Sequence, residues 1–540
     1  MNKQEKRKKI SIGVEDFKEI IDKDGYFVDK TLMIKKLIES QAKVTLFTRP
    51  RRFGKTLNQF MIRRFFEDEC TEKGEKVDNG YLFEGLKIAE CGEEILKHQQ
   101  QYPVIFLTLK SAKQPTYEMA YACLVDEICK EFERHSYVLQ GEMSQRNREI
   151  FERISLGKGS DDEYATAFAF LSECLFKYHK KKAIILIDEY DVPLENAYFR
   201  GFYDEMIDFI RSLFESALKT NPYLEKSVIT GCLRISKESI FTGLNNLKVD
   251  SVLRTEYGDS FGFTESEVEE MLAYYNLQEE LPEVKRWYDG YLFNDIEIYN
   301  PWSIINFVYD RDHKITQFAL PYWSNTSSNS IIREMVGEAD QKAKADLETL
   351  INGGTIEKPV HEDITYGDIH QTQDNLWNFL FFTGYLKKIG EQKEGNNLKL
   401  QMKIPNIEIA TIYENSISYW FEQRIKETDR SPLVRALETG DCEAAEDFIN
   451  RQLADTISYY DYAENFYHGF MAGLLVNIGG YSVKSNRESG NGRPDIVITE
   501  LKFRGRAMIL ELKVSETISG MEKKCEEGLA QIEKGNYAQP

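Results

Sequence analysis

Four short runs of continuous apolar residues constrain the fold of the first half of this chain most strongly. The runs are rich in β-branched and aliphatic residues and lie at 44–48, 104–109, 183–187 and 227–230. Such runs are typical of strands that are buried on both faces. The stretches between them, among them 117–132 and 202–218, have the apolar spacing of covering helices. The alternation predicts an α/β fold built on a parallel sheet.

A phosphate-binding loop is predicted where the first run ends, because residues 48–56 read TRPRRFGKT and precede a helical pattern. Backbone amides at such a helix N-terminus face the phosphates, Lys55 reaches the β- and γ-phosphates, and the Thr56 hydroxyl binds Mg²⁺. Arg49 stands at the first glycine of the G-x-x-x-x-G-K-[ST] pattern, where left-handed backbone costs about 1–2 kcal/mol. Either the start of the loop differs or nucleotide binding is impaired. Arg52 and Gly54 complete the candidate nucleotide-binding residues of the loop.

Two acidic residues, Asp188 and Glu189, end the third apolar run and are the predicted partners of this loop. Asp188 at the carboxyl end of a strand is expected to hold the Mg²⁺ shell, and Glu189 to polarise an attacking water. The alternative is that the two acids only cap the strand, with Asp191 and Pro193 turning the chain. We favour a site for ATP and Mg²⁺, because both motifs occur in the required order.

The fourth run ends at Thr230, where a sensor of the γ-phosphate is expected. Arg234 follows closely. Its side chain either approaches the phosphates or forms a structural salt bridge, and the sequence favours neither. Both residues are candidates for cofactor binding.

The pattern of predicted helices and strands changes from about Phe263. Residues 265–275 are expected to form a helix behind a Thr264 N-cap, and 376–382 form another. Residues 384–389 and 398–404 are expected to pair across the turn at 395–397. A helix followed by a hairpin fits a winged-helix module, but we favour a lid packed on the sheet domain.

The chain length of 540 residues predicts roughly three domains, because a domain typically has about 150 residues. We assign 1–262 to the phosphate-loop domain, 263–430 to the lid or middle region, and 431–540 to a third domain. The third domain is expected to contain helices, three strands and a final helix.

An acidic group near the C-terminus predicts a second Mg²⁺ site. Asp495 opens an apolar strand, and a second apolar strand ends in Glu511-Leu512-Lys513. Glu511 and Lys513 share a face because they are two residues apart in a strand, and Asp495 converges from the neighbouring strand. Two carboxylates and a backbone carbonyl suit Mg²⁺, which acidifies a water while Lys513 orients that water or stabilises the transition state.

Further side chains are candidates for the same site. Glu464 and His468 are four residues apart and so lie on one helix face; Glu464 is a candidate metal ligand, whereas His468 packs or caps a polar edge. Glu488 also points to this pocket in our interpretation. Glu-x-Lys alone is a weak signal, because it also starts at residues 283, 391, 500 and 522.

Charge and composition exclude several classes of protein. The net charge of −20 excludes a generic nucleic-acid-binding surface. Residues 481–513 nevertheless contain seven basic and four acidic residues, which favours contact with a phosphate backbone, although a solvated sheet edge explains part of this charge. The sequence contains neither an apolar run of membrane-spanning length nor a signal-peptide pattern. Eight cysteines without a CxxC pair indicate reduced thiols and a cytoplasmic location.

These motifs resemble the bacterial AAA-ATPase-like family, which is typically fused to a C-terminal PD-(D/E)XK nuclease-like domain. The resemblance is carried by residues 47–57 (FTRPRRFGKTL), 187–193 (IDEYDVP) and 233–238 (LRISKE). It extends to residues 25–31 (GYFVDKT), 299–303 (YNPWS), 485–490 (SNRESG) and 492–495 (GRPD). Ordered motifs thus occur in all three regions.

The resemblance implies a P-loop ATPase core with an additional strand between its two nucleotide motifs, and a nuclease-type fold at the end. It also explains Arg49, because the family carries arginine at that position. Gln531 and Tyr537 resemble the helix that follows the catalytic strands of this nuclease class. The sequence stops at Pro540, before the next expected strand. This predicts an incomplete nuclease sheet in what is then a fragment.

Three hypotheses about function follow. The first is an ATP-regulated, Mg²⁺-dependent nuclease that acts on DNA. The second is a nucleotide-dependent switch whose C-terminal domain binds nucleic acid or a partner without cleavage. The third is a structural remnant in which both sites are degenerate.

Overall fold

The computed structural model divides the chain into two compact units. One comprises Met1–Ser327 with Thr355–Ala410, and the other comprises Ser328–Gly354 with Thr411–Pro540. The structure describes residues 7–234, 240–241, 246–254, 256–323, 332, 341–361, 373–395, 397–427, 429–454, 471, 474–475, 480–485, 495–502, 505–515 and 517–535.

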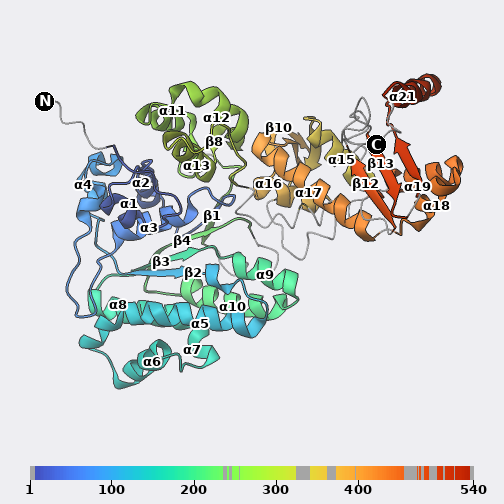
Figure 1. Ribbon diagram of the computed structural model, residues 1–540. Coiled ribbons are helices and arrows are strands. Elements are labelled where there is room, and N and C mark those ends of the chain that lie inside the picture. Colours follow the sequence, from blue (N-terminus) through green and yellow to red (C-terminus); the bar gives the residue numbers. More distant parts are fainter. Residues whose placement is uncertain are drawn as a thin grey trace. The chain divides into compact units, whose positions relative to one another are not determined.

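A five-stranded parallel sheet forms the centre of the first unit (Figure 1). Its strands, in the spatial order β2-β3-β4-β1-β5, are β2 (Val104–Thr108), β3 (Ala183–Asp188), β4 (Leu224–Gly231), β1 (Val44–Thr48) and β5 (Leu247–Asp250). All residues of β1 and β3 are buried, as their continuous apolar sequences predicted. The sheet confirms the α/β prediction, and β4 between β1 and β3 is the additional strand that the family resemblance implied.

Helices pack along these strands. α3 (Lys55–Phe66) follows β1 and contacts β2, β3 and β4, whereas α5 (Tyr117–Arg134) packs on β2 and α8 (Ala167–His179) on β3. The predicted helix at 202–218 is α10 (Tyr203–Phe214) continued by one π-turn. The remaining helices of this part are α1 (Phe17–Asp22), α2 (Leu32–Glu39), α4 (Glu93–Leu96), α6 (Gln145–Ser155), α7 (Asp161–Ala165) and α9 (Val192–Arg200).

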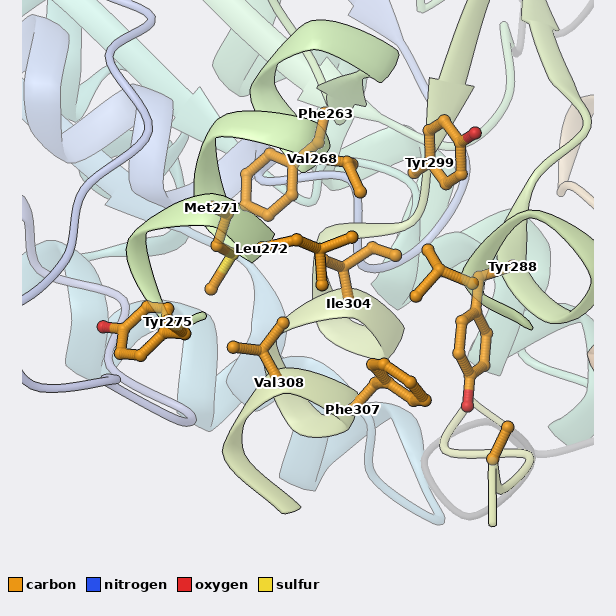
Figure 2. Packing of buried hydrophobic residues seen from close by; sticks show 12 residues of the cluster. Phe263, Val268, Met271, Leu272, Tyr275, Tyr288, Tyr299, Ile304, Phe307 and Val308 are labelled. Atoms are coloured by element: carbon orange, nitrogen blue, oxygen red, sulfur yellow. The ribbon is translucent and has the colours of Figure 1, made fainter. Parts of the chain in front are cut away.

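The middle region begins with a small antiparallel sheet and three helices. These elements are β6 (Phe263–Thr264), α11 (Glu265–Tyr274), α12 (Leu281–Tyr288), β7 (Tyr291–Phe293), β8 (Ile296–Tyr299) and α13 (Pro301–Asp312). The Thr264 side chain accepts a hydrogen bond from the Glu267 amide, and Glu267 caps the Thr264 amide in return, which confirms the predicted start of α11. Figure 2 shows the core of this region, in which Met271 and Leu272 of α11 face Ile304 and Val308 of α13.

The predicted helix and hairpin follow in the same unit. They are α16 (Gln373–Phe382), β10 (Lys387–Glu394) and β11 (Asn397–Lys403), and β9 (Ile356–Pro359) adds a third antiparallel strand that we did not predict. Gly384, with φ of 92°, packs on Pro50 of the phosphate loop: a Cβ atom there would lie 2.9 Å from the Pro50 Cβ. Part of the middle region therefore rests on the phosphate loop.

The second unit contains the predicted helices, three strands and final helix. α17 (Ile407–Glu427) leads into it, followed by α18 (Ser431–Thr439), α19 (Cys442–Ala454), β12 (Tyr481–Ser485), β13 (Ile496–Glu500), β14 (Ala507–Leu510) and α21 (Met521–Gly535); α15 (Gln341–Ile351) also belongs to this unit. The strands form an antiparallel sheet in the order β12-β13-β14, and Ile496 and Ile498 pack on Leu433 of α18 and Phe448 of α19. Among the described helices of both units, none combines the length and apolarity that a membrane span requires.

Candidate functional site

The phosphate loop joins β1 to α3, and its left-handed residues are Arg52 and Gly54. Their φ angles are 70° and 82°, and Gly54 is the N-cap of α3. Arg49 is not among the left-handed residues. The strain that we expected at Arg49 is therefore absent, and the turn of the loop is made three residues later.

The Arg49 side chain is turned into the protein and is completely buried. Its Nη2 lies 2.5 Å from Asp250 Oδ1, and its Nη1 donates to the carbonyl oxygens of Thr48 and Asp250. The guanidinium also contacts the rings of Phe261 and Phe293, with its carbon 5.0 and 5.2 Å from their centres. This side chain ties β1 to β5, so it is engaged in a buried ion pair, and only the backbone of Arg49 is left to contact a nucleotide.

Lys55 lies inside the loop and is buried. Its Nζ donates to the carbonyl oxygens of Arg49 and Pro50, each at 3.1 Å, and lies 3.7 Å from Glu189 Oε1. Burial disfavours the ammonium form, but the neighbouring Cys232 and the carboxylates of Glu189 and the adjacent acids outweigh it and raise the Lys55 pKa. Lys55 therefore stays charged among acidic groups.

Asp188 accepts hydrogen bonds from two predicted site residues. Its Oδ2 accepts from the Thr56 hydroxyl at 2.8 Å, and its Oδ1 from the Thr230 hydroxyl at 2.7 Å. Burial, followed by the charge of Glu189, raises the Asp188 pKa to about 6. The parallel sheet brings these residues together, because β3 and β4 are neighbours and end at the same edge.

Glu189 follows β3 in a left-handed conformation, with φ of 55°. A non-glycine residue held in this way stores about 1–3 kcal/mol of strain, and such residues gather at functional sites. The conformation brings its carboxylate to Lys55 while 14% of the side chain stays exposed. Glu189 is thus the acid of this group that a water molecule can reach.

Asp191 is a residue of this site that we interpreted from the sequence only as part of a turn. Its Oδ2 accepts from the backbone amides of Cys232 and Leu233 at 2.8 and 3.1 Å, and its Oδ1 is buried without a partner among the described residues. Burial, then the charge of Glu189, raises its pKa to about 7. The available signal was its position three residues after Asp188, as the third acid in the motif.

The Thr56 hydroxyl and the Asp188 carboxylate are the groups of this site that would hold a divalent cation beside a nucleotide. The Lys55 ammonium interacts with the carboxylates of Asp188, Glu189 and Asp191, and Asp191 Oδ1 has no partner among the described residues. Oxygen-rich sites of this kind, with a hydroxyl and a carboxylate in contact, suit Mg²⁺ held beside phosphates. Arg234 is half-buried and lies just beyond Leu233.

The side of the loop nearest the middle region is packed by aromatic residues. The Arg52 guanidinium lies 4.6 Å from the ring centre of Trp302, and the Phe53 ring lies 5.0 and 5.2 Å from those of Tyr291 and Phe293. A cavity of about 680 Å³, including the open space at its mouth, adjoins Gly54. Its walls are mainly apolar and come from α3, the N-terminal segment and the middle region, among them Leu57, Tyr26 and Phe263.

The candidate site in the second unit lies where β13 begins and β14 ends. Ile496 is paired with Leu510, so one further step of the register sets Asp495 opposite Glu511. The Asp495 Oδ2 accepts a hydrogen bond from the Leu512 amide at 2.8 Å. Asp495 therefore reaches the segment that carries Glu511, as the sequence predicted.

Glu511 and Lys513 form an ion pair, with Lys513 Nζ 2.9 Å from Glu511 Oε1. The Glu511 side chain is only 2% exposed, and its Oε2 is buried without a hydrogen-bond partner among the described residues. Gly528 of α21 covers this pair, since a Cβ atom there would lie 3.5 Å from Lys513 Cγ and 3.8 Å from Glu511 Cγ. The unpartnered oxygen fits a ligand of a metal ion.

Other predicted ligands of this second site cannot be placed. Glu464, His468 and Glu488 lie outside the described residues. Within the described part of the chain, no group of three or more His, Cys, Asp or Glu side chains is arranged to hold a metal ion. Of the predicted ligands of this site, the structure therefore describes Asp495 and Glu511.

Comparisons with known proteins agree with this architecture. Residues 11–241 match a family model described as "Predicted AAA-ATPase", and residues 462–540 match the PD-(D/E)XK nuclease superfamily. The chain is also 24% identical over 533 residues to an "Uncharacterized protein in vnfD 5'region" from Azotobacter chroococcum mcd 1, an alignment that covers 94% of this chain and 90% of that relative. The two family matches confirm the resemblance that the sequence motifs predicted.

Proposed function

From a chain that carries an AAA-ATPase-like domain at 11–241 and a PD-(D/E)XK nuclease superfamily domain at 462–540, we propose an ATPase coupled to a DNA nuclease. ATP with Mg²⁺ binds the phosphate loop, and a second Mg²⁺ binds the C-terminal acids. The observation that carries the ATPase proposal is that the Thr56 and Thr230 hydroxyls both bond Asp188.

The loop residues have separate roles in nucleotide binding. The free amides at the start of α3 face the phosphates, as in other anion sites at helix N-termini. Lys55 exchanges its bonds to the carbonyls of Arg49 and Pro50 for bonds to phosphate oxygens. Mg²⁺, held by Thr56 and Asp188, would neutralise charge on the phosphates. Glu189 orients the attacking water, and Thr230 acts as the sensor that contacts the γ-phosphate.

The nucleoside part of ATP has a place beside this loop. The cavity next to Gly54 has mainly apolar walls, as binding sites for small molecules do. Leu57 and Asn58 of α3 line it and directly follow Thr56, whose hydroxyl bonds Asp188. We assign the base and ribose to this cavity.

The C-terminal domain is proposed to cut DNA. Asp495 and Glu511 would hold Mg²⁺, which lowers the pKa of a bound water and stabilises charge on the phosphate. Lys513, paired with Glu511, orients the water or stabilises the transition state. The described basic residues of this unit, among them Lys484 and Arg506, supply attraction for the phosphate backbone.

The test is cleavage of linear and supercoiled duplex DNA by the full chain with Mg²⁺, with and without ATP. We expect the double variant Glu511→Gln/Lys513→Ala to lose cleavage. The matched control is Glu500→Gln/Lys502→Ala, because these residues form the same Glu-Leu-Lys sequence on the neighbouring strand and a similar ion pair. Equal cleavage by wild type and the Glu511/Lys513 variant would remove the nuclease proposal.

A second candidate function is a nucleotide-dependent switch whose C-terminal domain binds nucleic acid or a partner without cutting. The packing of Arg52 on Trp302 and of Phe53 on Tyr291 favours it, because a loop that changes shape on nucleotide binding also moves the middle region. The switch would be supported by tight ATP binding, ATP turnover that takes minutes or longer per cycle, and no DNA cleavage. Multiple turnover stimulated by DNA would support the coupled nuclease.

A further inference from the structure

The end of β4 is fastened to the residues that follow β3 by contacts of residues 190 and 191. The Tyr190 amide donates to the Thr230 carbonyl at 3.1 Å, and the Tyr190 hydroxyl donates to the Leu233 carbonyl at 2.6 Å. The Asp191 carboxylate accepts from the amides of Cys232 and Leu233. The segment from Thr230 to Leu233 is thus held by the two residues that directly follow Asp188 and Glu189.

The space around Asp191 is closed by the backbone of β4. A Cβ atom on Gly231 would lie 2.8 Å from Asp191 Oδ1 and 2.5 Å from the Tyr190 ring. Only glycine therefore allows this approach. Asp191 is 1% exposed, so it is part of the interior of the site and its carboxylate is not a surface cap.

The charged neighbours of Asp191 are the groups of the proposed ATPase reaction. Its electrostatic partners are Glu189, which repels it, and Lys55, which attracts it. One carboxylate oxygen carries two amide bonds, whereas the other has no partner among the described residues. A carboxylate used only to cap a turn needs no such position among these groups.

We propose that Asp191 is a positioning residue of the ATPase reaction, which holds the segment from Thr230 to Arg234 in register with Asp188 and Glu189. The inference rests on the proposed ATPase function. Thr230, the expected sensor of the γ-phosphate, lies on the segment that Asp191 fastens, and Arg234, which either approaches phosphate or forms a structural salt bridge, directly follows Leu233. Without the two amide bonds, the nucleotide still binds to the loop, but the γ-phosphate is no longer aligned with the water that Glu189 orients.

The test compares kcat, KM and the Kd for ATP in the full chain for Asp191→Ala and Asp191→Asn. The Asn side chain keeps an oxygen that accepts both amides. We expect Asp191→Ala to lower kcat about 100-fold, with the Kd for ATP within about threefold of wild type. The kcat of Asp191→Asn should be at least tenfold higher than that of Asp191→Ala. Asp204→Ala, on the exposed face of α10, is the control and leaves kcat unchanged.

The outcomes of this comparison decide the proposal. Unchanged kcat in folded Asp191→Ala, or a Kd that rises in step with the fall in kcat, overturns the positioning role. If Asp191→Ala does not fold, Asp191→Leu and Asp191→Asn, which have similar volumes, are compared instead; a kcat ratio near one between them overturns the role, and a ratio of at least ten supports it. Absence of ATP turnover in wild type would instead remove the proposed ATPase function itself.

Discussion

The guanidinium of Arg52 lies 4.6 Å from the centre of the Trp302 ring. Arg52 is the left-handed residue at the tip of the phosphate loop, and Trp302 lies in the first turn of α13. The Trp302 Nε1 donates to the Tyr322 carbonyl, which fixes the plane of the ring. The middle region therefore stabilises a strained conformation of the loop that is expected to bind phosphate.

Replacing Trp302 by alanine tests this relationship. A cation–π contact contributes about 0.5–1 kcal/mol at an exposed site, so its loss makes the left-handed Arg52 less favourable. We expect the Kd for ATP to rise about two- to fivefold in Trp302→Ala, with Trp302→Phe closer to wild type. Calorimetric titration of the full chain with ATP measures both. An unchanged Kd in Trp302→Ala would show that the contact does not organise the loop for binding.

The second prediction concerns Lys55 and the effect of ATP on stability. A ligand that binds only the folded state at 100 times its Kd adds about 2.7 kcal/mol to the free energy of unfolding. Wild type should therefore melt at higher temperature with ATP and Mg²⁺, and Lys55→Ala should lose that shift. Lys130→Ala, an exposed lysine of α5, should keep it. A shift retained by Lys55→Ala would contradict the assignment of the phosphate site.

The strands of the sheet were predicted well because burial on both faces demands continuous apolar residues, which are visible in the sequence. β5 was missed, since its sequence Leu247–Asp250 is half polar and its side chains are mostly half-buried at the sheet edge. Thr230 contacts Asp188 because the parallel strands β3 and β4 end at one edge of the sheet, and Thr56 reaches Asp188 from the first turn of α3. The shared edge of a parallel sheet thus brings together motifs that are far apart in the sequence.

Two features of the site were not predictable from local sequence. Arg49 pairs with Asp250, which is 201 residues away on the unpredicted strand β5. Asp191 accepts from amides more than 40 residues away, so its local pattern shows only a turn. In both cases tertiary packing brings the side chain to its partner, and no sequence-spacing rule connects the side chain with that partner.

The Arg49–Asp250 ion pair yields a third prediction. Both side chains are buried, and removing one partner of a buried pair costs about 3–5 kcal/mol because the other charge is left unpaired. We expect Arg49→Met to lower the free energy of unfolding by that amount, and Arg49→Met/Asp250→Leu to recover most of it. Chemical denaturation measures the three proteins. A single variant as stable as wild type would show that Arg49 has no such structural role.

The last prediction concerns Glu408, a buried carboxylate at the start of α17. Its oxygens accept from the Ser303 hydroxyl at 2.8 and 3.0 Å and from the Trp323 amide at 2.9 Å. Burial raises its pKa to about 7, and these hydrogen bonds oppose the shift only in part. The folded state therefore favours the protonated acid more than the unfolded state does.

The sign of the pH effect follows from this difference. Because the folded pKa lies above the ordinary value of 4.5, the contribution of Glu408 is fully present below pH 4.5 and is lost as the pH rises toward 7. The shift corresponds to roughly 3 kcal/mol at most. Glu408→Gln keeps acceptor and shape but cannot ionise, so its melting temperature should exceed that of wild type at pH 8 and approach it at pH 5. Asp188 and Asp191 also have raised pKa values and are present in both proteins, so the difference between the two melting curves isolates Glu408. A constant difference across this range would show that Glu408 does not titrate on folding.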